Sequence, residues 1–193
     1  IFWLFYSPDQ KIAACGSSYM SLTFTVRRAV LADAAALPAI ERSAAELFRL
    51  DPSLGWLAEA EVPEAAQHLL AIEHAFVWVA ENSDPEVVGF LRAVEIDQQL
   101  HIEELSVSQH CQGQGIGRAL VLVAIEHAHQ QALRAVTLAT FRDLPWNAPF
   151  YQRLGFNVLV APLIDQHLIE ALQAEIAIGF PGERRCAMRL PIP

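Results

Sequence analysis

The chain has little cysteine and no apolar segment long enough to cross a bilayer. Its three cysteines, Cys15, Cys111 and Cys186, are far apart in the 193 residues, so they match neither a disulfide framework nor a metal-ligand spacing. Residues 1–6 are apolar but too short to span a membrane, and no basic stretch precedes them as in a signal peptide. We therefore expect a reducing, cytoplasmic location and no bound metal.

Positive charge is also scarce. The 13 Lys and Arg residues are outnumbered by 22 Asp and Glu residues, which gives a formal net charge of −9. Such a surface repels phosphate backbones and anionic headgroups, so we expect neither nucleic-acid binding nor membrane binding. The same charge permits a cationic substrate.

What the sequence does contain is a glycine-rich turn between a strand pattern and a helix pattern. The segment LSVSQHCQGQGIG, residues 105–117, leads directly into a long apolar helix. Gly113, Gly115 and Gly117 leave the backbone uncovered where a ligand could approach. The free N–H groups of the first helical turn then favour an anion, such as a phosphate or pyrophosphate.

Two common phosphate motifs are excluded at this turn. The chain has no Gly-Lys pair and therefore no P-loop. A G-x-G-x-x-G fingerprint would need glycine at the positions of Arg118 or Leu120. The spacing that does fit is Gln112-x-x-Gly115-x-Gly117.

A second informative segment, NAPFYQRLGF at residues 147–156, follows a β-branched strand pattern at residues 135–141. Asn147 can cap a short helix, Pro149 suits its first turn and Gly155 ends it. Together the two segments resemble the acetyl-CoA pyrophosphate loop and the Asn…Tyr…Gly-Phe segment of the GCN5-related N-acetyltransferase (GNAT) superfamily.

The resemblance implies a mixed α/β (α+β) fold. Its centre is a twisted, mostly antiparallel sheet of about six to seven strands, flanked by helices and splayed at the two central strands. We expect residues 20–193 to form this single domain. Residues 1–19 are then an N-terminal extension, a cloning remnant or the product of a misassigned start.

Hydrophobic periodicity predicts the elements of this domain in order. Strands are expected at residues 22–28, 76–81, 87–96, 100–107, 135–141, 156–160 and 185–190, with the second and third forming a hairpin. Helices are expected at residues 32–49, opening at Asp33, and at residues 63–72, 118–126 and 165–178, with a loop at residues 51–56.

The resemblance also implies a co-substrate, acetyl-CoA, and residues that bind it. Tyr151 would donate a proton to the departing CoA sulfur. The pantetheine arm would lie beside the 100–107 strand like an added strand, and the pyrophosphate would lie in the glycine turn. The residues expected to bind acetyl-CoA are Leu105, Ser106, Val107, Gln112, Gly113, Gln114, Gly115, Ile116, Gly117, Arg118, Asn147 and Tyr151.

The general base is predicted from strand alternation. An alkylammonium group must lose a proton before it attacks a thioester. By resemblance, a carboxylate an even number of positions before Val107 faces the substrate, which selects Glu103, with His101 next. Glu104 has the wrong parity unless a β-bulge shifts the strand.

The sequence therefore predicts an acetyl-CoA-dependent N-acetyltransferase that works by direct attack of a primary amine. No acyl-enzyme is expected, since Cys111 has no evident activating partner. A small-molecule amine is the first choice of acceptor and a protein or peptide amine the second. A non-catalytic acyl-CoA sensor is the alternative from another class. Residues 47–63 and 162–182 are expected to select the acceptor, and a homodimer is left open.

Overall fold

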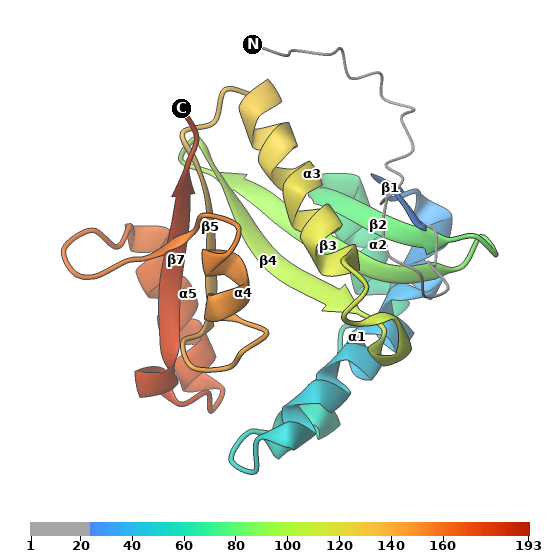
Figure 1. The fold of residues 1–193 in the computed structure, drawn as a ribbon, viewed down its shortest axis with the longest axis horizontal. Coiled ribbons are helices and arrows are strands. Elements are labelled where there is room, and N and C mark those ends of the chain that lie inside the picture. The colour runs from blue at the N-terminus through green and yellow to red at the C-terminus, as the bar shows by residue number, and fades with distance from the viewer. Residues whose placement is uncertain (1–23) are drawn as a thin grey trace.

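In a computed structural model, residues 24–193 form a seven-stranded sheet with helices on both faces (Figure 1). The strand order is β1 (Phe24–Arg28), β2 (Phe76–Asn82), β3 (Val87–Ile96), β4 (Gln99–Val107), β5 (Ala135–Phe141), β7 (Arg185–Pro191) and β6 (Asn157–Val158). Neighbouring strands are antiparallel except β4 and β5, which run parallel. The expected α/β class and mostly antiparallel sheet are confirmed. The extension expected at residues 1–19 lies outside the described residues.

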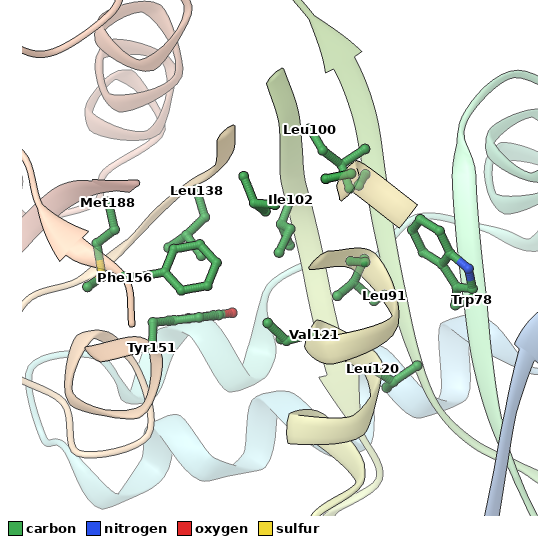
Figure 2. Packing of buried hydrophobic residues seen from close by; sticks show 14 of the residues in the cluster. Trp78, Leu91, Leu100, Ile102, Leu120, Val121, Leu138, Tyr151, Phe156 and Met188 are labelled. Atoms are coloured by element: carbon green, nitrogen blue, oxygen red, sulfur yellow. The ribbon is translucent and has the colours of Figure 1, made fainter. Parts of the chain in front are cut away.

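The helices divide between the two faces of the sheet (Figure 1). One face carries α3 (Ile116–Gln130) and α4 (Ala148–Gln152), and the other carries α1 (Leu37–Ala45), α2 (Ala65–His74) and α5 (Gln166–Ala177). The larger apolar core lies under α3 and α4, where Leu120 and Val121 meet Ile102 and Leu138 of the two central strands (Figure 2). This burial fixes α3, and therefore the glycine turn before it, against the centre of the sheet.

The long helix expected at residues 32–49 is wrong, because three shorter elements replace it. These are the 3₁₀ helix η1 (Leu31–Ala35), α1, and the 3₁₀ helix η2 (Glu46–Leu50). Pro38 lies in the first turn of α1, where its missing N–H is tolerated. Asp33 does not open α1. Its carboxylate accepts from the Val30 amide at 2.8 Å and pairs with Arg27 at 2.7 Å, so it joins η1 to β1.

Several smaller boundaries also differ from expectation. Residues 55–59, expected partly as loop, form the 3₁₀ helix η3 (Gly55–Glu59), and the second helix begins at Ala65 rather than residue 63. The strand expected at residues 156–160 is short. It pairs with β7 at Asn157 and Val158, and after a last backbone hydrogen bond from Leu159 to the Ala187 carbonyl the chain turns out to an exposed Val160 before Pro162. Two more 3₁₀ turns, η4 (Gln109–Cys111) and η5 (Gly182–Arg184), precede α3 and β7.

A β-bulge interrupts β4 in the middle of the predicted site. Arg92 of β3 lies opposite Glu104, but the next residue, Ala93, lies opposite Ile102, so Glu103 is an extra residue. The strict alternation assumed for this strand is therefore wrong. Leu105 now shares the α3 face with Ile102, because one inserted residue shifts every later side chain to the other face.

The two central strands separate beyond the bulge, as expected. β4 and β5 pair from Gln99–Ala135 to Ile102–Leu138, whereas β4 continues to Val107 and β5 to Phe141. Figure 1 shows the two strands diverging below this pairing. The β4 edge that faces β5 is thus free of strand partners from Glu103 onward.

A substitution at Gly89 tests how tightly β3, β4 and α3 pack against one another. A Cβ atom there would lie 3.0 Å from the Ser106 carbonyl oxygen and 3.3 Å from Ile116 Cγ2. We expect Gly89→Ala to lower the free energy of unfolding in urea by about 1–3 kcal/mol through overpacking. Gly55→Ala is the matched control, because a Cβ atom at Gly55 has no heavy atom within 4 Å. Equal losses in the two variants would contradict this account.

Candidate active site

The turn before α3 has the conformation that its glycines predict. Gly115 is the N-cap residue of α3 with a φ of 86°, and Gly113 has a φ of 74°. Both values strain a residue that carries a Cβ atom. The first turn of α3 contains no acidic side chain, so its free amides can face an anion. Gln112 Nε2 donates to the Val107 carbonyl at 3.0 Å and ties the turn to the end of β4.

A cavity of about 750 Å³ extends from this turn into the gap between β4 and β5. The elements that wall it are α1, η2, η3, β4, the glycine turn, β5, α4, α5 and β7. Sequence reasoning named many of its lining residues in advance. Those that line it are Glu103, Leu105, Ser106, Val107, Gln112, Gly113, Gly115, Ile116, Gly117, Arg118, Asn147 and Tyr151.

Two candidates do not line the cavity. The Gln114 side chain is exposed and donates to the His110 carbonyl at 3.2 Å. His101 faces the α5 side of the sheet, where its Nδ1 lies 3.2 Å from Thr137 Oγ1 and its ring lies 5.4 Å from that of His167. Burial, and then the charge of His167, lower the pKa of His101 to about 4. The structure therefore separates His101 from the other candidate bases.

Tyr151 lies on α4 with its ring among aromatic neighbours. Its ring centroid is 4.9 Å from Phe150 and 5.6 Å from Phe156. Figure 2 shows its hydroxyl pointing away from α4 toward Val121 of α3. Burial raises the pKa of the Tyr151 phenol above its usual range, and the charge of Glu104 raises it further. The phenol therefore keeps its proton at neutral pH and can donate a hydrogen bond.

Asn147 does not cap α4 through its side chain, so that expectation is wrong. Its backbone carbonyl accepts from the amides of Phe150 at 2.8 Å and Tyr151 at 3.1 Å. The side-chain Oδ1 is buried without a hydrogen-bond partner among the described residues. An unpaired buried amide is costly, and this one lines the cavity, so it is suited to a ligand.

The bulge gives the two neighbouring glutamates different surroundings. Glu103 has a side chain 37% exposed and lies with Oε2 3.0 Å from Arg92 Nε. Glu104 accepts from Ser106 Oγ at 2.7 Å. Burial raises the pKa of Glu104, while the Ser106 hydrogen bond and the Arg92 charge oppose the rise. A carboxylate with a raised pKa is better matched to base catalysis near neutral pH.

Sequence reasoning anticipated only part of the far wall of the cavity. Residues 47–63 and 162–182, expected to select the acceptor, contribute lining side chains such as Phe48 and Phe180. Arg185 was not foreseen, although it lies 4.5 Å from the centre of the Phe141 ring and pairs with Glu175. Glu41 of α1 was also missed. Neither charged residue belongs to a local motif, so the sequence carries no signal for them.

The described residues offer little for metal or thiol chemistry. Within residues 24–193, no group of three His, Cys, Asp or Glu side chains could hold a metal ion. Cys111 lines the cavity but is buried, and desolvation raises the pKa of its thiol. A raised thiol pKa disfavours the thiolate nucleophile.

Comparison with known proteins identifies the family. A model of the acetyltransferase (GNAT) family matches residues 37–156. The chain therefore belongs to this family, whose members are acetyl-CoA-dependent acetyltransferases.

Solved structures share the fold at low sequence identity. One is the PaiA N-acetyltransferase from Thermoplasma acidophilum in complex with coenzyme A, with 16% identity, a TM-score of 0.64, and coverage of 89% of this chain and 100% of that one. Another is the ribosomal-protein-S18-alanine N-acetyltransferase from Escherichia coli, with 16% identity, a TM-score of 0.62, and coverage of 88% and 94%. A third is Rv2747 from Mycobacterium tuberculosis in complex with CoA and NLQ, with 21% identity, a TM-score of 0.61, and coverage of 88% and 99%.

No helix in residues 24–193 combines the length and the apolar character that crossing a membrane requires.

Proposed function

We propose that the chain transfers an acetyl group from acetyl-CoA directly to a primary amine of a small molecule in a ternary complex. One observation carries the proposal: a single cavity joins the glycine turn to Tyr151 and Glu104 between the separated strands. Its carboxylate-bearing walls suit a cationic acceptor. Cys111 and Cys186 are free thiols, which is consistent with action in the reducing cytoplasm.

The proposed placement of acetyl-CoA follows the chemistry of the cavity walls. The amides at the start of α3 and the guanidinium of Arg118 would hold the pyrophosphate. The β4 edge that β5 leaves free would pair with the amide groups of the pantetheine arm. The buried Oδ1 of Asn147 would accept a hydrogen bond from an amide of the same arm.

The reaction can be written with its protons balanced. Glu104 accepts a proton from the bound ammonium group, and the free amine nitrogen attacks the thioester carbonyl carbon. The new C–N bond forms as the C–S bond breaks, and the Tyr151 hydroxyl donates to the departing thiolate. The nitrogen gives up its second proton, which restores Tyr151. The products are the acetamide and CoA thiol, with one proton released to solvent from Glu104.

Glu104 takes the role of base in this proposal because of the bulge. The assignment of Glu103 rested on strict alternation, which the extra residue breaks. Glu103 is also the more exposed of the two glutamates, and its Oε2 lies 3.0 Å from Arg92 Nε. Glu104 combines a raised pKa with a charge that acts on Tyr151.

An acetyl-transfer assay on an amine panel tests the activity. We expect the purified chain to release CoA thiol from acetyl-CoA with at least one small primary amine, and to act less well on peptide amines. Gly115→Asp should lose acetyl-CoA binding in calorimetry, because its carboxylate would repel the pyrophosphate.

Gly115→Asn is the matched control, because Asp and Asn have similar size and both tolerate a positive φ. It should bind more tightly than Gly115→Asp. Equal affinity in the two variants would place the anion elsewhere. Acetyl-CoA binding without turnover on any amine would favour the sensor.

Removal of one hydroxyl tests the proton donor. Tyr151→Phe should fold and bind acetyl-CoA normally, because the ring and its aromatic contacts remain. Its single-turnover rate should fall by roughly 10²–10⁴-fold if the hydroxyl donates to the leaving thiolate. A rate close to that of the wild type would reduce Tyr151 to a packing role.

Two neighbouring substitutions test the base. Glu104→Gln should lower the rate at neutral pH by roughly 10²-fold or more, and part of the rate should return at higher pH, where more free amine is present. Glu103→Gln removes the same charge one residue away and should have little effect. A critical Glu103 beside a silent Glu104 would show that the bulge does not decide the base.

A further inference from the structure

Glu41 places a second carboxylate beside Glu104 in the cavity. Glu41 lies on α1, which covers the opposite face of the sheet from α4, and both glutamates line the cavity. Burial raises the pKa of Glu41 to about 7, and the nearby Glu104 charge adds to the rise. Because the charge of Glu104 acts on Glu41 and both line one cavity, the two carboxylates share one site.

The cations around this pair do not balance it. Arg92 of β3 is the cation that lowers the pKa of both carboxylates. The same guanidinium also lies 3.0 Å from Glu103. Three ionised carboxylates would therefore share one guanidinium, which leaves the site with a deficit of positive charge.

His68 of α2 does not supply the missing charge. Its side chain is 1% exposed, and burial followed by the charge of Arg92 lowers its pKa, so the ring is neutral at pH 7. Its Nε2 lies 3.5 Å from Glu41 Oε2, and neither atom has a hydrogen-bond partner among the described residues. The buried ring therefore lies beside Glu41 without a hydrogen bond to it, and leaves the carboxylate without a hydrogen-bond donor within residues 24–193.

We infer that Glu41 and Glu104 together hold the ammonium group of the acceptor, with Glu41 as the second binding carboxylate. The inference rests on the proposed amine acetylation. An ammonium group carries the positive charge that the site lacks, and its several N–H donors can reach two carboxylates at once. Glu41 fixes the nitrogen while Glu104 takes its proton.

The experiment compares Glu41→Gln with the wild type on the best amine of the panel. KM for the amine should rise roughly 10–100-fold, as for the loss of a charge-assisted hydrogen bond. KM for acetyl-CoA should not change. Glu73→Gln, on the exposed side of α2 and outside the cavity, removes the same charge and should leave both values unchanged. Glu41→Asp keeps the charge and should recover part of the amine affinity.

The pH profile of kcat/KM distinguishes an electrostatic role of Glu41 from a purely structural one. Around the pair lie Arg92 of β3, His68 of α2, Glu103 of β4 and Tyr151 of α4. Removing the like charge of Glu41 makes Glu104 easier to ionise. The acid limb of kcat/KM should therefore shift to lower pH in Glu41→Gln.

Unfolding in urea gives a measurement independent of activity. Because the folded-state pKa of Glu41 is raised from 4.5 to about 7, its contribution to stability falls as pH rises through that window. The urea midpoint of Glu41→Gln relative to the wild type should therefore increase from pH 5 to pH 8.

The outcomes separate the two proposals. If the wild type acetylates amines while Glu41→Gln keeps the amine KM and the acid limb, the role of Glu41 is overturned and the proposed function stands. If the wild type binds acetyl-CoA but acetylates no amine, both are overturned.

Discussion

The loss of pairing between β4 and β5 beyond Ile102 and Leu138 is the constraint on which the site depends. Backbone groups on that edge of β4 lack strand partners, and such groups are costly to bury unless something else bonds to them. Apolar packing of α3 under both strands keeps them in place despite the missing ladder. The gap therefore persists as a cavity, and the unpaired backbone groups of β4 can hydrogen-bond to a ligand that has amide groups.

The bulge at Glu103 acts together with this separation. It reverses the side-chain alternation just where β4 leaves β5, so apolar Leu105 and Val107 continue the α3-side core while Glu104 and Ser106 face α1. One inserted residue thus keeps the core continuous and gives the cavity its acidic side. Each strand half follows ordinary alternation, and only the joint between them departs from it.

This arrangement explains which features the sequence predicts well. The glycine turn and the α4 segment are local, because left-handed backbone positions, a proline in a first turn and helix periodicity are written in consecutive residues. The bulge depends on the pairing of β4 with β3, and the approach of Glu41 to Glu104 depends on the packing of α1, so neither leaves a local pattern. Asp33 and Asn147 show the same limit. Both residue types favour helix caps, yet Asp33 caps η1 rather than opening a long helix and pairs with Arg27, and the Asn147 side chain makes no cap bond and lines the cavity.

The position of β7 sets the order in which the site is completed. β7 follows every other described strand in the chain, yet it lies between β5 and β6, and β6 has no other partner in the sheet. During synthesis, α4 with Tyr151 and the following β6 therefore emerge before β7, the strand with which β6 pairs. The same late strand brings Arg185 to the far wall of the cavity. A growing chain would thus contain the glycine turn well before β7, and the cavity would lack the wall that carries Arg185 until β7 inserts.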